Sequence, residues 1–564
     1  MPKRLAITIA GAVSLGSYEA GVLYEVVETI RRHNANTADP AAQIEIDVLT
    51  GASAGGMTAI ILGQKLLYCG PEFLDANGAG KPYDNPLYNT WVKRISLAGL
   101  QDTQADEPAL HSIFSSDLIN QISSEVIMSR YATNPPSPAG APHPVAAATI
   151  RIGVAVSNLN GVDYGYTVKP DGHFIYIDYA DQFTRVADGP NSDNQAFWAP
   201  LHEAAVACGA FPFAFRAKDL QRSAKNEPFD YPPGDLLPWT NDPQLFTYSD
   251  GGIFQNQPLG IAKNLVDEFD PHQSQDSRFY LFVSPNAKDA TANDNFHEKN
   301  ADYVQMARRL ATIVIGQSSF HDWINAEDVN KKIALLDARS VGLKDAILGG
   351  KIDVPALLLT AESLLALFFP GGSHTPPGAS KSESLDDART RIATQYKVEM
   401  AALGNDAPQA IAFRDAVLAF ESAAGLGARD HMEIYGVTAT DSELAGAGLC
   451  AFLGFFDQKF RDHDYDVGRS HARNMLQNAA LGQPGAIGPL NPGPYPDDIH
   501  TIDQRLNGLK LHDVPPADMN AFKAGLKKRV NQMMKEQFGN WSLLADPVVD
   551  QIVSVAMDKM ADRM

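Results

Sequence analysis

The sequence contains few cysteines, fewer basic than acidic residues, and no hydrophobic run long enough to cross a bilayer. The three cysteines, Cys69, Cys208 and Cys450, are far apart and lack the spacing of metal ligands, which predicts buried thiols of a reducing compartment. There are 46 lysines and arginines against 67 aspartates and glutamates, and the net charge of -21 argues against a nucleic-acid partner. The same charge opposes strong attachment to anionic lipid, so any membrane contact is expected to be apolar and local.

Two apolar segments require a choice between membrane and globular structure. The amino-terminal stretch "MPKRLAITIAGAVSLG" resembles a signal peptide, but its apolar run contains Gly11 and Gly16 and lacks a convincing small-residue cleavage site. The segment from Val354 to Phe369 is shorter than the roughly 18 to 20 residues of a membrane span and contains Glu362. We expect it to be a core or docking helix, with an interfacial helix as the alternative. We therefore expect a cytoplasmic protein and leave peripheral membrane contact open.

Two strand-turn-helix units at the amino terminus predict an α/β fold. Apolar residues alternate from Leu5 to Ile9 as in a strand, Gly11 to Gly16 form a turn, and apolar residues recur at helical spacing from Val22 to Ile30. A second strand from Ile44 to Leu49 leads through another glycine turn into a helix with Met57 near its start. Two such units in succession predict a mostly parallel sheet covered by helices.

The length of 564 residues allows two to four domain-sized units. Further strands are expected in "TIRIGVAVSNLNG" and "HFIYIDYA", a small-residue helix from Leu201 to Phe215 broken at Pro212, and mainly helices after about residue 300. Pro/Gly-rich breaks fall at Pro370–Ser384 and Gly482–Asp498. We divide the chain into a core (1–330), a helical accessory region (331–445), a segment too apolar to stay solvated that packs back on the core (446–480), and a linker with carboxy-terminal helices (481–564).

The turn after the second strand reads "GASAG", with Ser53 between Gly51 and Gly55. A serine at a sharp strand-to-helix turn is typical of a nucleophile elbow, whose glycines are needed because neighbouring backbone passes where a Cβ would clash. The alternative is a glycine-rich turn with an incidental serine. A serine nucleophile needs a base, either a histidine oriented by an acid or an aspartate that acts directly.

Three segments of the sequence resemble the patatin-like phospholipases. They are the elbow "GASAG", the turn "DGGIFQNQP" that begins at Asp250, and the first glycine turn "GAVSLGSYEAGVL". Weaker similarity occurs in "AAVACGAFPFAF" and in the downstream stretch from Gly454 to Leu476. The resemblance implies a three-layer α/β/α core that hydrolyses lipid or phospholipid acyl esters and needs no metal or cofactor.

Carried over to this sequence, the resemblance implies that Ser53 is the nucleophile and Asp250 the base of a catalytic dyad. Gly251 and Gly252 let the chain turn tightly after Asp250. Ser53 follows the predicted strand from Ile44 to Leu49, and Asp250 follows a strand that we expect in "QLFTYS". Parallel strands bring their carboxyl ends to one edge of a sheet, which would place the two side chains together.

The backbone N–H groups of the first glycine turn, Gly11, Ala12, Val13 and Gly16, would stabilise the oxyanion. Here the chain departs from the family, which usually has consecutive glycines and a basic residue at this place. Neither Ala12 nor Val13 tolerates a positive φ well, so the departure concerns the geometry of the oxyanion hole.

Two other functions stay open at this point. One is a Ser-Asp-His esterase in which a histidine after Asp250, such as His272 or His297, completes a triad. The other is a catalytically silent lipid-binding or scaffold protein. His202 and His321 are expected to be packing or helix-face residues. The acidic stretch Asp462–Asp466 lacks the second cluster that a metal site needs, and we expect it to form ion pairs with Arg461 and Arg469.

Overall fold

The chain forms two compact units in the computed structural model. The first comprises Met1–Ala262, Asp276–Phe320 and Ile434–Met564, and the second comprises Lys263–Gln275 and His321–Glu433. The structure describes residues 2–103, 107–133, 140–168, 172–232, 235–269, 277–285, 306, 321–374, 382–426, 432–478, 489–493, 499 and 502–538. Large parts of the two predicted Pro/Gly-rich breaks, residues 375–381, 482–488 and 494–498, lie outside these ranges. The four-part division of the chain stays a prediction.

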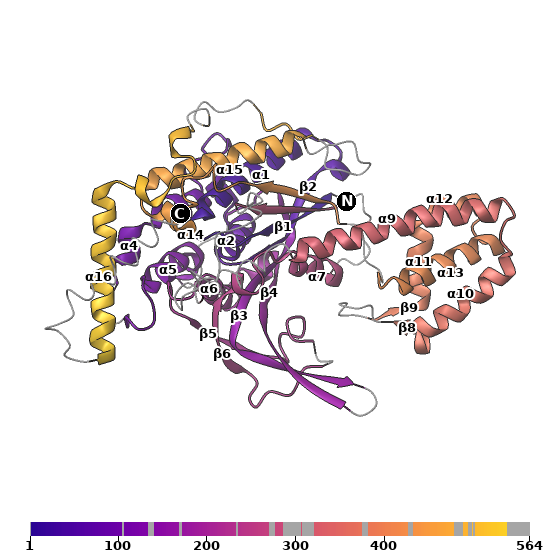
Figure 1. The fold of residues 1–564 in the computed structure, drawn as a ribbon. Coiled ribbons are helices and arrows are strands. Elements are labelled where there is room, and N and C mark those ends of the chain that lie inside the picture. The colour runs from indigo at the N-terminus through magenta and orange to yellow at the C-terminus, as the bar shows by residue number, and fades with distance from the viewer. Residues whose placement is uncertain are drawn as a thin grey trace. The chain divides into compact units, whose positions relative to one another are not determined.

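A central sheet organises the first unit (Figure 1). Its strand order is β10-β7-β1-β2-β3-β6-β5, and β4 pairs with β3. Neighbouring strands from β10 to β3 run parallel, whereas β4, β5 and β6 are joined through antiparallel pairs. The strands of this sheet are β1 (Lys3–Ile9), β2 (Ile44–Gly51), β3 (Ala146–Val168), β4 (Gly172–Asp188), β5 (Lys218–Arg222), β6 (Gln244–Asp250), β7 (Arg278–Ser284) and β10 (Ile434–Thr438).

Helices flank this mostly parallel sheet, which confirms the predicted α/β class with a layered α/β/α core. Side chains from Leu5 to Ile9 are all buried, and because successive strand residues point to opposite faces, both faces of β1 are covered. The described helices of this unit are α1 (Gly16–Asn36), α2 (Ala54–Tyr68), α3 (Pro86–Tyr88), α4 (Leu97–Gln101), α5 (Ser116–Ser123), α6 (Gln195–Cys208), α14 (Gly448–Ala451), α15 (Gln458–Asn478) and α16 (Pro516–Phe538). Helix α7 (Leu259–Phe269) begins in the first unit, and its residues from Lys263 belong to the second.

Helix α15 packs along α1, although more than 400 residues separate them in the sequence (Figure 1). The two helices approach closely at Gly21 and Gly468, because a Cβ on either glycine would collide with the backbone of the other helix. Glu25 of α1 is buried and forms ion pairs with Arg469 at 3.2 Å and Arg473 at 3.1 Å. This carboxy-terminal helix is therefore part of the packed first unit.

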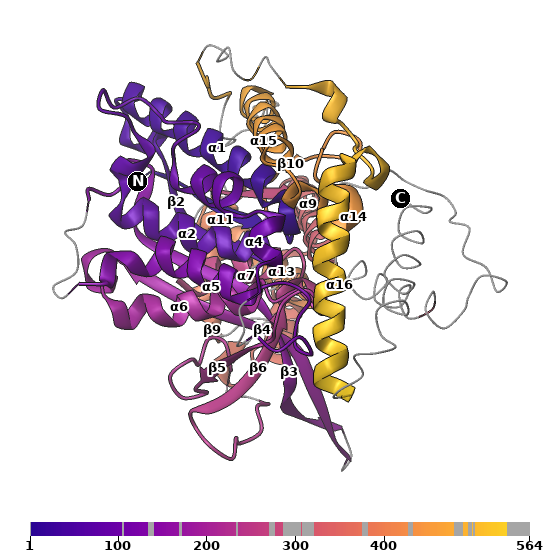
Figure 2. The same ribbon diagram turned by 90° about the vertical axis from the view of Figure 1, so that its left-hand side faces the viewer.

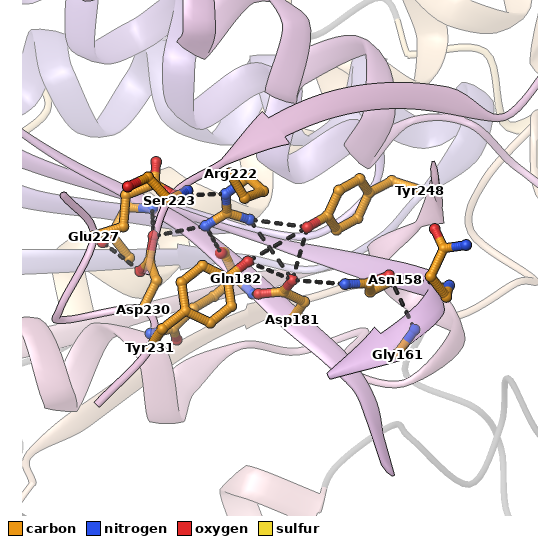
Figure 3. A network of polar contacts seen from close by, with 12 residues as sticks. Asn158, Gly161, Asp181, Gln182, Arg222, Ser223, Glu227, Asp230, Tyr231 and Tyr248 are labelled. Atoms are coloured by element: carbon orange, nitrogen blue, oxygen red, sulfur yellow. Dashed lines mark hydrogen bonds and ion pairs between the residues drawn. The ribbon is translucent and has the colours of Figure 1, made fainter. Parts of the chain in front are cut away.

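A buried charge network joins the antiparallel strands (Figure 3). The Arg222 side chain at the end of β5 is fully buried and lies 2.8 Å from Glu227, 3.0 Å from Asp230 and 3.6 Å from Asp181. Burial raises the pKa of Asp230 to about 7, although the charge of Arg222 and two hydrogen bonds from Thr184 oppose this shift. Removing one member of such a network leaves an uncompensated buried charge, which typically costs about 3 to 5 kcal/mol.

Two tyrosines extend the network toward β6. The hydroxyls of Tyr231 and Tyr248 donate to Asp181 at 2.8 and 2.9 Å, and the Asn158 side chain donates to the same carboxylate at 3.3 Å (Figure 3). Tyr248 lies two residues before Asp250 in β6, so the network fixes the strand that carries Asp250.

The second unit is helical. Its elements are α9 (His321–Leu348), α10 (Val354–Phe368), α11 (Leu385–Gln395), α12 (Lys397–Leu403), α13 (Pro408–Ala423) and the short strands β8 (Ser373–His374) and β9 (Glu383–Ser384). Helix α10 was predicted from Val354 to Phe369 and buries Ala361 and Leu365, whereas Leu359 and Leu367 are 69% and 75% exposed. Within the ranges that the structure describes, no helix combines the length and apolar character needed to span a bilayer.

Two details of the predicted secondary structure need correction. Helix α6 extends from Gln195 to Cys208, so the predicted range from Leu201 to Phe215 is wrong at both ends. The helix begins early because the Asn194 side chain accepts the N–H of Phe197, which is a favourable helix start. The strands expected in "TIRIGVAVSNLNG" and "HFIYIDYA" are longer than predicted and form one antiparallel hairpin, β3–β4.

Candidate active site

Ser53 occupies a strained turn between β2 and α2. Its φ and ψ are 52° and -128°, a region that non-glycine residues rarely adopt and that costs about 1 to 3 kcal/mol. A Cβ on Gly55 would collide with the backbone of Ile9 and Ala10, and a Cβ on Gly51 would collide with the backbone of Gly55. The glycines are thus required by close backbone contacts, and the turn has the geometry expected of a nucleophile elbow.

Asp250 lies at the end of β6 and faces Ser53. The Ser53 hydroxyl donates to the Asp250 Oδ2 atom at 2.5 Å, and the Gly252 N–H donates to Oδ1 at 2.7 Å. The main chain of Asp250 is also held, since its N–H donates to the Ala210 carbonyl at 3.0 Å and its carbonyl accepts from the Ser157 hydroxyl at 2.7 Å. Both carboxylate oxygens of Asp250 are therefore oriented by hydrogen bonds.

The two side chains meet by a different route from the one expected. We expected both residues at the carboxyl ends of parallel strands, but β6 runs antiparallel to β3. Strand β3 pairs with β2 as far as Val154, opposite Gly51, and with β6 from Val156, opposite Asp250. Strand β4 occupies the other edge of β3 over these residues. The carboxyl ends of β2 and β6 therefore face each other along one edge of β3.

The environment of Asp250 suits it for proton transfer near neutral pH. Asp250 is 2% exposed and Ser53 is 7% exposed. Burial raises the pKa of Asp250 to about 6, because a carboxylate loses hydration there, while hydrogen bonds from Ser53 and Gly252 act in the opposite direction. A base with a pKa close to the working pH is efficient in general base catalysis.

The predicted oxyanion loop begins beside the serine. A Cβ on Gly11 would lie 3.2 Å from the Cβ of Ser53, so the backbone of Gly11 passes directly by that side chain. The Gly11 N–H donates to the Asn256 carbonyl at 3.0 Å, and the Gly16 N–H donates within the 3-10 turn Val13–Leu15. These two predicted oxyanion donors are therefore already engaged.

The two remaining predicted donors are Ala12 and Val13. In the described part of the chain, no group accepts a hydrogen bond from the N–H of either residue. Val13 has a φ of 52°, which is unusual for a β-branched residue. The sequence predicted difficulty at this position, because valine tolerates a positive φ poorly. Of the four predicted oxyanion donors, the N–H groups of Ala12 and Val13 thus remain as candidates.

A distant segment braces this loop through Ser14, a contact that the sequence did not predict. The Ser14 hydroxyl donates to the Ala451 carbonyl and accepts the Gly454 N–H at 3.2 Å. A Cβ on Gly454 would lie 2.6 Å from the Ser14 Oγ atom, so only glycine fits beside it. Two signals in the sequence pointed to this segment, namely the apolar character of residues 446–480 and the similarity from Gly454 onward, but neither indicated Ser14 as its partner.

Helix α15 binds both ends of the segment from Ala445 to Gly454, which we call the bracing segment. Arg461 donates to the Gly454 carbonyl at 2.7 Å and to the Val92 carbonyl at 2.9 Å, whereas the buried carboxylate of Asp464 accepts the N–H groups of Ala445 and Gly446 at 2.7 and 2.9 Å. Arg461 therefore binds carbonyls, and the expectation that it pairs with the acidic stretch Asp462–Asp466 is wrong. Arg469 does contact Asp466, at 3.3 Å.

The histidines and possible metal ligands can be placed only in part. His202 lies in α6 with its Nδ1 atom 3.4 Å from Glu203 and contacts neither Ser53 nor Asp250. His272, His297 and the side chain of His321 lie outside the described residues. Among the side chains that the structure describes, no group of three histidines, cysteines or acids has a geometry that could hold a metal ion.

The fold is of the α/β class, and the site is a hydrogen-bonded serine-aspartate pair at a strained strand-to-helix turn. Residues 7–263 match the family model described as Patatin-like phospholipase. This matched part of the chain contains both Ser53 and Asp250.

Two individual proteins are also similar to the chain. The uncharacterized protein y4iI of Sinorhizobium fredii is 23% identical over 334 residues, which cover 46% of this chain and 45% of that relative. The chain thus spans less than half the length of this curated relative. The crystal structure of VipD from Legionella pneumophila shares 12% identity over 98% of this chain and 88% of that chain, with a TM-score of 0.21, which is too low to indicate a common arrangement.

Proposed function

We propose that the protein is a lipid acyl hydrolase that cleaves carboxylic esters through a Ser53-Asp250 dyad. The observation that carries this proposal is the 2.5 Å hydrogen bond from the Ser53 hydroxyl to a buried carboxylate, made at a strained elbow. The patatin-like family of residues 7–263 supports a lipid or phospholipid ester as the substrate.

The reaction would take place in two steps on Ser53. The Ser53 Oγ atom attacks the acyl carbonyl carbon while its proton passes to Asp250, and the N–H groups of Ala12 and Val13 donate to the oxyanion. Asp250 then gives the proton to the leaving alcohol, which departs and leaves an acyl ester on Ser53. A water molecule gives a proton to Asp250 and attacks this ester, and Asp250 returns the proton to Ser53 as the fatty acid is released.

The Ser-Asp-His esterase is the second candidate. It would need a histidine within hydrogen-bond reach of Ser53, and the acid would orient that histidine without touching the serine. The direct contact between Ser53 and Asp250 favours the dyad over this arrangement. The silent lipid-binding protein is the third candidate, and the strained Val13 in the oxyanion loop is the observation that favours it.

Hydrolysis by the purified full chain tests the proposal. We expect release of p-nitrophenol from a short soluble ester and of fatty acid from phospholipid or lysophospholipid, and we expect Ser53→Ala to reduce both to background. Ser363→Ala, which removes an exposed hydroxyl from α10, is the matched control and should keep full activity. A folded wild-type chain that hydrolyses none of these esters, or an active Ser53→Ala variant, would contradict the proposal.

A further inference from the structure

The β3–β4 hairpin carries apolar side chains beyond the body of the sheet. Strand β3 pairs with β2 and β6 only as far as Asn158, whereas its partner β4 continues beside it from Val162 to Val168. Figures 1 and 2 both show this hairpin extending past the other strands of the sheet. Four consecutive residues of β4 form what we call the hairpin patch: Phe174, Ile175, Tyr176 and Ile177.

The hairpin patch is exposed on both faces of the ribbon. Phe174 and Tyr176 are 63% and 48% exposed, and Ile175 and Ile177 are 67% and 48% exposed. Because alternate strand residues point to opposite faces, the first pair projects from one face and the second pair from the other. Exposed apolar residues in a continuous patch mark an interaction site, and this one needs a partner that covers two opposite faces.

The hairpin patch continues toward the candidate active site. Tyr179 of β4 is 40% exposed and stacks on Phe254, with ring centroids 6.4 Å apart. Phe254 is four residues after Asp250 and is itself exposed, so apolar surface leads from the hairpin to the turn that carries the candidate base. Phe213, three residues after the carbonyl that binds the Asp250 N–H, is also strongly exposed.

We propose that the hairpin patch is a lipid-contact surface that inserts into the interface of a lipid aggregate and brings the candidate active site to its substrate. The proposal rests on the proposed function for the identity of the partner. A lipid layer can surround a ribbon and cover both of its faces, whereas a flat protein surface would cover only one.

The unpaired outer edge of β4 limits how deeply the hairpin can insert into a lipid layer. Among the strands of the described residues, β4 pairs with β3 alone, so the backbone groups on its outer edge have no strand partner. Unpaired backbone groups are costly in hydrocarbon, which limits the hairpin to the boundary between headgroups and acyl chains. Tyrosines such as Tyr176 favour this boundary because one end of the ring is apolar and the other is polar.

Charge favours a neutral surface over an anionic one. The chain carries a net charge of -21, and Asp163, which pairs with Ile177 across the hairpin, is exposed. Acidic residues beside the patch repel anionic headgroups, so contact must come from apolar burial. We therefore expect binding to zwitterionic vesicles to equal or exceed binding to anionic vesicles.

Flotation of the full chain with phosphatidylcholine vesicles tests the proposal. We expect the double variant Phe174→Ser, Ile175→Ser to bind about tenfold or more weakly than wild type, since it removes two large exposed apolar side chains. The matched control, Leu359→Ser with Leu367→Ser, removes two exposed leucines from α10 and should bind normally. Weak binding by this control instead would overturn the proposal in favour of α10.

Hydrolysis of a short soluble ester separates the proposal from the proposed function. The hairpin double variant should keep this activity, which also shows that it is folded, and should lose hydrolysis of vesicle lipid. Inactive wild type that still binds vesicles through the hairpin would contradict the proposed function alone. Normal vesicle binding and normal vesicle hydrolysis by the double variant would overturn the lipid-contact proposal alone.

A second variant tests the contact directly. In Phe174→Trp, the added tryptophan should shift its emission to shorter wavelength when phosphatidylcholine vesicles are added, because the indole leaves water. An unchanged spectrum at saturating lipid would overturn the proposal. The proposal would also be overturned if the hairpin patch joined two copies of the chain. In that case the wild type and the α10 control would be dimers, whereas the hairpin double variant would be a monomer.

Discussion

The elbow that contains Ser53 and the oxyanion loop beside it each hold a non-glycine residue at a positive φ, but by different means. The elbow holds Ser53 at a φ of 52° through glycines whose neighbours in the sheet leave no room for a Cβ, so it is fixed by its own sequence and by β1. The oxyanion loop holds Val13 at the same φ through Ser14, which is bonded to Ala451 and Gly454. The elbow is therefore a local structure, whereas the loop depends on a segment more than 430 residues away in the sequence.

This difference indicates a purpose for the carboxy-terminal part of the first unit. A glycine-rich loop needs little support, because glycine adopts a positive φ without a steric penalty. A loop with Val13 at a positive φ must be held in place by its surroundings. Helix α15 supplies this support by binding the bracing segment through Arg461 and Asp464.

The largest expected effect comes from the serine-aspartate pair. Ser53→Ala and Asp250→Asn should each lower turnover of a soluble ester by about 10³-fold or more, because residues that act as a unit lose their effect together. Asp219→Asn, at an exposed carboxylate of β5, is the matched control and should retain activity. Substantial turnover by Asp250→Asn would show that the elbow works without its partner.

Stability should move in the opposite direction in Asp250→Asn. The pKa of Asp250 is about 6 in the folded protein and about 4 in an unfolded chain, so its charged form destabilises the fold above pH 6. We expect a higher melting temperature than wild type at pH 8 and a smaller difference at pH 5, measured by differential scanning calorimetry. A lower melting temperature at pH 8 would contradict the raised pKa.

The next largest effect concerns the loop. Gly454→Ala should place a methyl group against Ser14 and lower kcat by about tenfold to a hundredfold through a displaced oxyanion hole, with little change in KM. Gly342→Ala, in α9, has open space around the new methyl group and should leave activity unchanged.

Ser14→Ala provides a second variant in case Gly454→Ala folds poorly. It removes the hydroxyl that binds Ala451 and Gly454 without adding volume, and we expect a smaller loss of kcat in the same direction. If both variants fold and keep wild-type kcat, the loop does not depend on the distant segment, and the contrast with the elbow fails.

A smaller effect is expected in the pH profile. Asp250 must be ionised to accept a proton, so kcat/KM for a soluble ester should be constant above pH 7 and fall below a pKa of about 6, by about tenfold per pH unit. The profile of a Gly454→Ala variant should keep the same midpoint, because the loop does not touch the Asp250 carboxylate. A midpoint near pH 4 would indicate that Asp250 is not the titrating base.

The smallest expected effect is on the free energy of unfolding of variants at the two strained residues, Ser53 and Val13. Ser53→Gly should be more stable than Ser53→Ala by about 1 kcal/mol, since only glycine adopts this backbone conformation without strain. Val13→Gly should change stability little, because relief of strain is offset by the loss of the packed Val13 side chain. Urea denaturation measures both. Equal stability of the two Ser53 variants would show that the elbow is not strained.

Much of this fold could be predicted because its signals are local. The alternating strand from Leu5, the "GASAG" elbow and the Asp-Gly-Gly turn are each encoded within a few residues, and all three lie where the sequence predicted. The close approach of Ser53 and Asp250 was also predicted, but through a parallel arrangement that β6 does not have. Strand direction depends on pairing between distant segments, which one sequence does not reveal.

The remaining features depend on tertiary contacts that leave no pattern in the sequence. The hydrogen bonds of Ser14 join two segments that were each singled out in the sequence, but nothing in the sequence pairs them with each other, and the Gly11 N–H is occupied because the Asn256 carbonyl accepts from it. The pairing of β3 with β4 into one long hairpin was missed because the two strands were predicted separately. For Ser14 and Gly11 the decisive partner lies outside the window in which periodicity can be detected, whereas β3 and β4 are adjacent in the sequence and periodicity does not reveal that they pair.

The most direct test of the central claim is the rate at which a fluorophosphonate labels the full chain, with the modified residue mapped by mass spectrometry. A dyad predicts that Ser53 is labelled in wild type, that Asp250→Asn slows labelling by about a hundredfold or more, and that His202→Ala, His272→Ala and His297→Ala each react at the wild-type rate. Labelling of a different serine, rapid labelling of Asp250→Asn, or a histidine variant as slow as Asp250→Asn would contradict it.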